Sequence, residues 1–262
     1  MNILEQIITN KQQEVQLKKE LCTIKQLESS IYFNSKCVSF KQYISDPNRS
    51  GIIAEFKRKS PSKGFINKYA DAEEITIGYM QAGASALSVL TDEVFFGAVT
   101  KDFSSARKYN YCPILRKDFI IDEFQIIESK SIGADVILLI AKILSPQQIA
   151  QFTTLAHELG LEVLLEVQNE NEIKSTQHIS IDAIGINNRN LEKFTLNIEN
   201  SLELASFIPA TTIKISESGI ENIEQIKKLK EFGFQGFLIG EYFMKQTKPA
   251  LACRQFIQKL KA

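Results

Sequence analysis

The chain has 262 residues, of which 31 are basic and 31 acidic, so its formal net charge at pH 7 is zero. This balance excludes a broad electrostatic contact with nucleic acid or an anionic membrane as the main function. With 44% hydrophobic residues the composition is typical of a globular protein, and no apolar stretch approaches the ~18 residues of a membrane span.

The cysteine and histidine content argues against a metal site and against an oxidising compartment. The four cysteines lie far apart and form no CxxC motif, which favours free thiols in a reducing cytoplasm. The two histidines are too few for a His-rich metal site. Because the N-terminus lacks a basic region followed by a long apolar run, we expect no signal peptide and a cytoplasmic protein.

Residues 1–48 precede the first predicted strand and contain helical patterns, for example at Ile3, Leu4 and Ile7. No linker-like or low-complexity stretch separates them from the rest of the chain. We therefore expect a helical extension over 1–48 that packs on a single barrel domain, with 1–262 forming one unit.

Eight short runs of apolar or β-branched residues come after this extension, at intervals that fit a strand, a helix and two loops. Several are continuously apolar, which is typical of parallel strands buried on both faces. The runs cover residues 51–57, 86–90, 113–117, 134–140, 161–167, 183–187, 212–216 and 236–239.

The segments between these runs carry helix signals. Ser145, Pro146 and Gln148 form a capping box with a proline at the first helical position. Similar capping sequences begin at Asp71 and Asn169. A further helix is predicted from apolar residues at helical spacing, namely Ile223, Ile226, Leu229 and Phe232.

Eight strand–helix units in series predict an α/β fold, a (β/α)8 TIM barrel with extra N-terminal helices. A doubly wound open sheet is the alternative, but the units have similar sizes and no GxGxxG follows the first strand. In a barrel of this kind the active site lies at the C-terminal ends of the strands. Polar residues at those ends are therefore candidates for catalysis or binding.

Charged residues stand at several of these strand ends. Alternation along the first strand sends Glu55 and Lys57 into the barrel and Phe56 outward. Lys117 and Glu166 occupy inward positions near the ends of the third and fifth strands. Burying charges inside a barrel mouth costs solvation free energy unless the charges form ion pairs or take part in binding or catalysis. The set as a whole therefore indicates a functional site.

Small residues follow the last two predicted strands. Ser218 and Gly219 come after the seventh strand, and Gly240 with Glu241 after the eighth. Small residues let backbone N–H groups approach an anion, and the helix N-termini beyond them favour negative charge. Since this fold often binds phosphate with these two loops, we predict a phosphate site there. The alternative is that the glycines only form tight turns.

Three motifs are specific to one known family: IIAEFKRKSPSKG at 52–64, LRKDFI at 115–120 and INNRNL at 186–191. Across nearly its whole length the sequence resembles the indole-3-glycerol phosphate synthase family of tryptophan biosynthesis. The resemblance implies a decarboxylating and dehydrating ring closure of 1-(2-carboxyphenylamino)-1-deoxyribulose 5-phosphate, with no cofactor and no metal.

The resemblance also implies roles for the charged residues. Lys117 matches the general acid of ring closure, and Glu166 matches the general base of the dehydration. Glu55 matches a second catalytic carboxylate, and Lys57 matches a lysine tied both to that carboxylate and to the phosphate. Whether Glu55 or Lys57 delivers the proton during dehydration stays open.

Further positions match substrate contacts. Ser60 and Asn187 match residues around the aromatic ring and its carboxylate, and Arg189 matches a residue of the same pocket. Phe95 and Phe119 match apolar positions that hold the ring. The implied phosphate-binding residues are Lys57, Ser218, Gly219, Gly240 and Glu241.

Two departures from the family pattern concern the pocket. Phe96 replaces a small or polar residue, and is expected either to narrow the pocket mouth or to cover the loop. Tyr242 and Phe243 replace a small residue and a leucine, so the local packing after the eighth strand must differ.

Two alternative functions stay open. One is another phosphate-binding barrel enzyme, such as a sugar-phosphate isomerase or aldolase, and the other is a non-catalytic barrel that binds a phosphorylated ligand. The first explains the phosphate loops but not the three motifs together. The second would be marked by the loss of Lys117, Glu166 or Glu55, and all three are present. In each case we expect a phosphorylated small molecule as the partner, no nucleic acid or membrane, and a monomer or weak homodimer.

Overall fold

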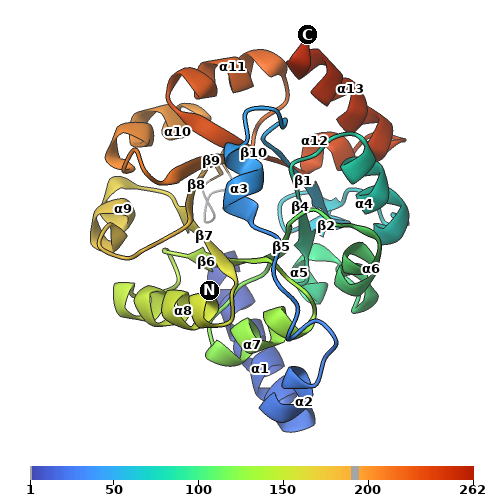
Figure 1. Ribbon diagram of the computed structural model, residues 1–262, viewed down its shortest axis with the longest axis vertical. Coiled ribbons are helices and arrows are strands. Elements are labelled where there is room, and N and C mark those ends of the chain that lie inside the picture. Colours follow the sequence, from blue (N-terminus) through green and yellow to red (C-terminus); the bar gives the residue numbers. More distant parts are fainter. Residues whose placement is uncertain (1, 190–194) are drawn as a thin grey trace.

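Eight parallel strands close into a barrel in the computed structural model, which describes residues 2–189 and 195–262 (Figure 1). Around the barrel the order is β1-β10-β9-β8-β7-β6-β5-β4, so pairing of β1 with both β10 and β4 closes the sheet. The predicted (β/α)8 TIM barrel is confirmed, and each strand overlaps one predicted run. The strands are β1 Ile52–Phe56, β4 Ala86–Leu90, β5 Ile114–Lys117, β6 Val136–Ile140, β7 Glu162–Val167, β8 Ala183–Asn187, β9 Ile213–Glu217 and β10 Phe234–Ile239.

Helices between the strands form the outer ring. They are α4 Ala72–Gln81, α6 Lys101–Tyr109, α7 Glu123–Ser131, α8 Pro146–Glu158, α9 Glu170–Thr176, α10 Glu199–Leu204, α11 Ile223–Glu231 and α13 Pro249–Lys261. Short elements lie in the loops at the C-terminal ends of the strands. These are the hairpin of β2 Lys59–Ser60 and β3 Gly64–Phe65, and the single turns α5 Glu93–Phe96 and α12 Glu241–Met244.

The helix boundaries follow the capping signals of the sequence. Ser145 forms a full capping box with Gln148 at the start of α8, with Pro146 in the first turn. Asp71 and Asn169 cap α4 and α9 through their side chains. Local sequence therefore sets where these helices begin.

The predicted apolar face of α11 is confirmed at three of its four positions and wrong at the fourth. Ile223 is half-buried and packs against the core. Ile226 and Leu229 are buried against the barrel, as the helical spacing predicts. Phe232 is 45% exposed, because the helix ends at Glu231 and Phe232 is its C-cap residue. A residue beyond the last helical turn no longer follows the 3.6-residue period, so its side chain leaves the apolar face.

Alternation along each strand divides the core into two layers. On β1, Ile52, Ala54 and Phe56 join the apolar layer between the barrel and the helices, whereas Ile53 joins the layer inside the barrel. The strands are therefore buried on both faces, as their continuous apolar runs predict. Inward side chains near the C-terminal ends can then meet in the barrel mouth.

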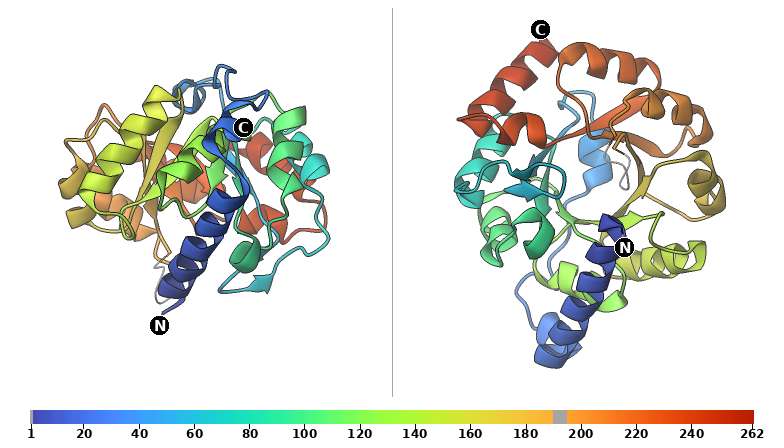
Figure 2. Two further views of the ribbon diagram at one scale, coloured as in Figure 1. Left: turned by 90° about the horizontal axis from the view of Figure 1, so that it is seen from below. Right: turned by 180° about the vertical axis from the view of Figure 1, so that it is seen from behind.

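The N-terminal segment forms α1 Ile3–Leu21, α2 Ile24–Glu28 and α3 Phe40–Ser45. Phe40 and Ile44 of α3 join the interior layer at one end of the barrel, with α3 in front of the strands in Figure 1. The first turns of α1 lie across the other end, as the view from behind in Figure 2 shows, and bury Leu4 and Ile7. α1 therefore covers part of the mouth where the strands end.

Over residues 2–189 and 195–262, no helix combines the length and the apolar character that crossing a membrane requires.

Candidate active site

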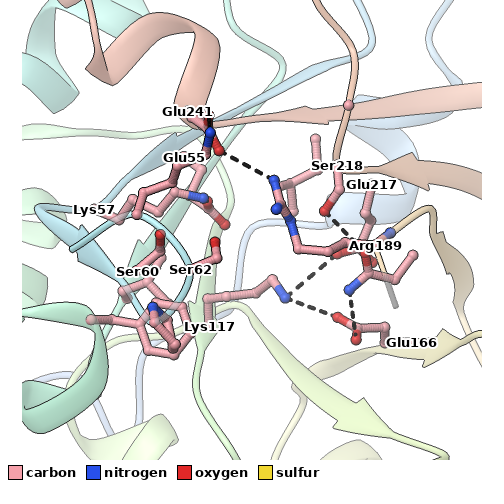
Figure 3. Close-up of a pocket in the computed structure, with 18 of the residues that line it drawn as sticks. Glu55, Lys57, Ser60, Ser62, Lys117, Glu166, Arg189, Glu217, Ser218 and Glu241 are labelled. Atoms are coloured by element: carbon pink, nitrogen blue, oxygen red, sulfur yellow. Dashed lines mark hydrogen bonds and ion pairs between the residues drawn. The ribbon is translucent and has the colours of Figure 1, made fainter. Parts of the chain in front are cut away.

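A cavity of about 570 Å³ opens at the C-terminal ends of the strands. Figure 3 shows charged side chains converging on it from opposite sides, with Glu55 and Lys57 on one side and Glu166 and Glu217 on the other. Of the residues predicted for the site, all line this cavity except Phe95. The predicted residues that line it are Glu55, Lys57, Ser60, Lys117, Phe119, Glu166, Asn187, Arg189, Ser218, Gly219, Gly240 and Glu241.

Lys117, at the end of β5, extends into the cavity between two carboxylates. Its Nζ lies 3.0 Å from Glu166 Oε2 and 3.5 Å from Glu217 Oε2. Burial alone would lower the pKa of Lys117, but the negative charges of Glu166, Glu217 and Glu55 outweigh it and raise the pKa well above its ordinary value. Lys117 is therefore a stable ammonium that faces the cavity, with its side chain 14% exposed.

Glu217, at the end of β9, belongs to the site although it was not predicted from the sequence. Its Oε1 is buried and has no hydrogen-bond partner among the described residues. Burial, only partly opposed by Lys117, raises the pKa of Glu217 to about 7. Strand alternation could have identified it, since it places Glu217 on the same inward face as Ile215.

Gly185 on β8 makes room for the Glu217 carboxylate. A Cβ atom at Gly185 would lie 2.0 Å from Glu217 Oε1, which is far inside van der Waals contact. Gly240 has the same relation to Glu55, because a Cβ there would lie 2.4 Å from Glu55 Oε1. Two of the buried carboxylates thus depend on neighbouring glycines for their space.

Glu55 and Lys57 form a second ion pair on the opposite side of the cavity. Lys57 Nζ donates to Glu55 Oε1 at 2.5 Å, and Ser88 Oγ donates to Glu55 Oε2 at 3.5 Å. The Glu55 side chain is 4% exposed and that of Lys57 is 17% exposed. Both point inward while Phe56 joins the outer layer, as alternation predicts.

Asn187, at the end of β8, connects the Glu166 carboxylate to the predicted phosphate side. Its Nδ2 donates to Glu166 Oε1 at 3.0 Å. Its Oδ1 accepts from the Arg189 backbone N–H and from Ser218 Oγ, both at 2.9 Å. Because donor and acceptor are both used, the amide orientation is fixed and the Glu166 carboxylate is oriented with it.

Arg189 reaches across the mouth to the loop after β10. Its Nη2 donates to Glu241 Oε2 at 3.2 Å, and Gln168 Nε2 donates to its backbone carbonyl at 2.9 Å. The last residues of the INNRNL motif, Asn190 and Leu191, lie outside the described residues.

The two predicted phosphate loops both border the cavity. Ser218 and Gly219 have left-handed backbone, with φ of 68° and 80°, and Gly240 is the N-cap residue of α12. The Glu241 carboxylate is paired with Arg189, so only the backbone of Glu241 is suited to an anion. Loops of this kind, with small residues ahead of helices, are suited to bind a phosphate.

The aromatic wall differs from the prediction at one residue. Phe96, not Phe95, lines the cavity, and its ring centroid lies 6.0 Å from that of Phe119. Phe95 and Phe96 both lie on α5, but Phe95 is half-buried against the interior layer outside the cavity lining. Adjacent residues on a helical turn point in different directions. Similarity to the family motif therefore does not show which of the two rings, Phe95 or Phe96, faces the cavity.

Ser60 and the N-terminal helix complete the lining. Ser60 Oγ is buried and has no hydrogen-bond partner in the described part of the chain, which leaves a hydroxyl available at the cavity. Ile3, Leu4 and Ile7 of α1 supply an apolar surface. Within the described ranges, no group of three or more His, Cys, Asp or Glu side chains could hold a metal ion.

Similarity to solved structures concerns the fold alone. A 3-hexulose-6-phosphate synthase from Salmonella typhimurium matches with a TM-score of 0.62 at 12% identity, over 80% of this chain and 98% of that chain. A chain of the tryptophan synthase α2β2 complex from Pyrococcus furiosus matches with a TM-score of 0.58 at 13% identity, over 81% of this chain and 98% of that one.

Sequence relatives are much closer. The Indole-3-glycerol phosphate synthase of Bacteroides thetaiotaomicron is 48% identical over 259 residues, covering 99% of both chains. The protein of the same name from Bordetella pertussis is 37% identical, covering 98% of this chain and 99% of the relative. The family model described as Indole-3-glycerol phosphate synthase matches residues 4–256. The chain therefore belongs to the indole-3-glycerol phosphate synthase family.

Proposed function

We propose that this protein converts 1-(2-carboxyphenylamino)-1-deoxyribulose 5-phosphate to indole-3-glycerol phosphate, carbon dioxide and water. The observation that carries the proposal is the position of Lys117, an ammonium held between Glu166 and Glu217 inside a cavity that the two phosphate loops also border. A ketone placed between an aromatic end and a phosphate end would lie against this ammonium.

Ring closure is the step assigned to Lys117. The aromatic carbon that carries the carboxylate attacks the ketone carbon, and Lys117 Nζ donates a proton to the ketone oxygen. The carboxylate then leaves as carbon dioxide, and its bonding electrons restore the aromatic ring. The carboxylates around Lys117 keep it protonated, so its proton is present when the ketone oxygen gains negative charge.

Dehydration completes the indole ring. Glu166, oriented by Asn187, accepts a proton from the ring carbon beside the nitrogen, while the hydroxyl made in the first step leaves as water. Glu55 or Lys57 supplies the proton to that hydroxyl, and the two side chains form an ion pair across the cavity from Glu166. Ring closure therefore uses the Lys117 side of the cavity, whereas dehydration uses groups on both sides.

Binding uses the remaining polar groups and the apolar wall. The phosphate lies against Ser218, Gly219 and the backbone of Gly240 and Glu241, and Lys57 contributes charge. Asn187, Arg189 and the free hydroxyl of Ser60 are the groups near the substrate carboxylate and sugar. The aromatic ring packs on Phe119 and Phe96.

The reaction is tested by following indole fluorescence after mixing the purified protein with this substrate in the presence of EDTA. Rising fluorescence is expected, and it would persist with the chelator because no step uses a metal. A flat trace from folded protein that still binds the substrate would favour the non-catalytic alternative. A flat trace without binding would favour a different phosphorylated substrate.

The phosphate site is tested by two substitutions at Ser218. Asp and Asn both tolerate left-handed backbone, so each preserves the turn. Ser218→Asp adds a negative charge and is expected to raise KM about tenfold, whereas Ser218→Asn is expected to change it much less. Equal KM values for the two variants would argue against a phosphate at this loop.

We further propose that the protein acts in the cytoplasm as a monomer or weak homodimer. All four cysteines are free, which supports a reducing compartment. Residues of one chain supply both the charged cluster and the phosphate loops, which supports a site that is complete in a monomer. Sedimentation velocity at micromolar concentration tests the oligomeric state, and a dimer that persists on dilution would contradict it.

A further inference from the structure

Lys11, in the middle of α1, is a fully buried lysine outside the reacting cluster. Its Nζ lies 2.7 Å from Glu14 Oε2, 2.9 Å from Asp118 Oδ1 and 3.1 Å from Asp92 Oδ2. The Lys11, Asp92 and Asp118 side chains are all 0% exposed. An ammonium has three N–H donors, so as many carboxylates surround Lys11 as it has donors.

Both buried carboxylates belong to segments that form the cavity wall. Asp92 is the N-cap residue of α5, where its Oδ1 accepts from the Phe95 backbone N–H at 2.8 Å, and α5 carries Phe96. Asp118 directly follows Lys117, and its Oδ1 accepts from the Phe119 backbone N–H at 2.8 Å. Each carboxylate therefore fixes the backbone beside one of the two aromatic rings.

The helix that carries Lys11 supplies the third part of the same wall. Ile3, Leu4 and Ile7 of α1 line the cavity, and Figure 2 shows this end of α1 lying across the barrel mouth. One ammonium thus joins the three segments that surround the predicted position of the aromatic ring. Its ion pairs within the described ranges involve no residue of the phosphate loops after β9 and β10.

We propose that Lys11 is a positioning residue that holds α1, α5 and the Lys117–Phe119 segment together and so sets the shape of the pocket for the aromatic half of the substrate. This inference rests on the proposed function, which supplies the aromatic ring. Lys11 touches no reacting atom and acts through the segments it joins.

Asp92 is the most sensitive member of the cluster. Asp118 also accepts from Arg116 Nη2 at 3.1 Å, so it keeps a cation without Lys11. Among the described residues, Asp92 Oδ2 accepts no hydrogen bond, and the ion pair of Asp92 is with Lys11 alone. Loss of the Lys11 charge would leave Asp92 buried beside no cation, and α5 would have to move to hydrate it, displacing Phe96.

The test measures two ligands with Lys11→Met. The first ligand is the substrate with its ketone reduced to an alcohol, which carries the aromatic ring but cannot cyclise, and the second is glycerol 3-phosphate, which carries only the phosphate end. We expect Lys11→Met to weaken binding of the reduced substrate about tenfold and to change that of glycerol 3-phosphate less than about twofold. In turnover, KM is expected to rise more than kcat falls.

Lys19→Met is the matched control. Lys19 also lies on α1 and pairs with an aspartate after β5, Asp122, at 2.6 Å, but its side chain is 41% exposed. This variant is expected to bind both ligands as the wild type does. Equal loss of both ligands in Lys11→Met would show that Lys11 only supports the fold, and unchanged binding of the reduced substrate would also overturn the inference.

Asp92→Asn keeps the inference testable if Lys11→Met does not fold. Asparagine still caps α5, and Lys11 keeps Glu14 and Asp118, so the fold is preserved while the link to α5 is weakened. We expect this variant to bind the reduced substrate about threefold more weakly than the wild type, with its affinity for glycerol 3-phosphate unchanged. Equal affinity changes for the two ligands, or no change for either, would overturn the inference. A wild-type protein that forms no indole product would instead overturn the proposed function, so the two failures are distinguishable.

Discussion

Two lysines near the barrel mouth are each surrounded by carboxylates, yet one cluster is closed and the other is open. Lys11 is 0% exposed, and three carboxylates enclose its ammonium. Lys117 is 14% exposed, hydrogen-bonds Glu166 and faces the cavity. An enclosed ammonium such as that of Lys11 therefore stabilises the fold, whereas an ammonium that faces a cavity, such as that of Lys117, can react with a bound substrate.

The carboxylates of the two clusters differ in the same way. Burial alone would raise the pKa of Asp118, but Lys11 and Arg116 outweigh it and hold the pKa well below its ordinary value. Burial dominates at Glu217, where Lys117 opposes it only in part and the pKa lies at about 7. The closed cluster therefore keeps its carboxylate charged, whereas the open cluster contains one that changes protonation near neutral pH.

The largest expected effect is on turnover in the open cluster. Lys117→Ala removes the proton donor for ring closure and should lower kcat by about 10²–10⁴-fold. Its chemical denaturation midpoint should fall less than that of Lys11→Met, because the carboxylates left behind border the cavity and Glu217 can become neutral by protonation. Steady-state indole fluorescence measures the first quantity, and near-wild-type turnover would refute the assignment of Lys117 as the acid.

The closed cluster should show the reverse pattern. Lys11→Met leaves buried carboxylates without their shared cation and should lower the free energy of unfolding by about 3–5 kcal/mol. The exposed pair removed by Lys19→Met should contribute about 0–1 kcal/mol. Urea denaturation followed by circular dichroism compares them, and similar values for the two variants would contradict the distinction between closed and exposed pairs.

An intermediate effect is expected where Gly185 faces Glu217. Gly185→Ala places a Cβ atom against Glu217 Oε1 and should destabilise the protein by about 1–3 kcal/mol. In a protein that also carries Glu217→Asp, the shorter side chain moves the carboxylate away from residue 185. Gly185→Ala should then change the free energy of unfolding very little. Additive effects in this double-mutant cycle would show that the two residues are not in contact.

The smallest expected effect is a change in how stability depends on pH. The raised pKa of Glu217 means that the folded state binds more protons than the unfolded state between the ordinary value of 4.5 and about 7. The Glu217 contribution to stability is therefore fully present below that range and is lost as the pH rises through 7. Between pH 5 and 8 the wild type should lose about 1–2 kcal/mol relative to Glu217→Gln. Parallel stability curves would show that Glu217 is already ionised at pH 5.

Much of this arrangement could be predicted from the sequence because it follows from local periodicity. The strand runs, the capping box at Ser145 and the inward positions of Glu55, Lys117 and Glu166 all depend on alternation or on neighbouring residues. Periodicity also places Glu217 inward, but a carboxylate at a strand end can have many roles. Glu217 is distinguished by its position in the cavity and by its buried Oε1, which has no hydrogen-bond partner among the described residues.

The remaining features depend on contacts between distant segments. Lys11 is an ordinary polar position in a helical pattern, and its burial follows from Asp92 and Asp118, which lie far away in the sequence. The choice of Phe96 over Phe95 depends on how the single turn α5 is rotated against Phe119. Neither feature has a local signal, so tertiary structure was needed to find them.

The most direct test of the role of Lys117 is a crystal structure of the protein with the reduced substrate bound. We predict that the hydroxyl that replaces the ketone lies within about 3 Å of Lys117 Nζ, with the phosphate at Ser218 and Gly240 and the ring beside Phe96 and Phe119. A complex in which Lys117 contacts only Glu166 and Glu217, or in which the aromatic ring occupies the phosphate loops, would contradict it.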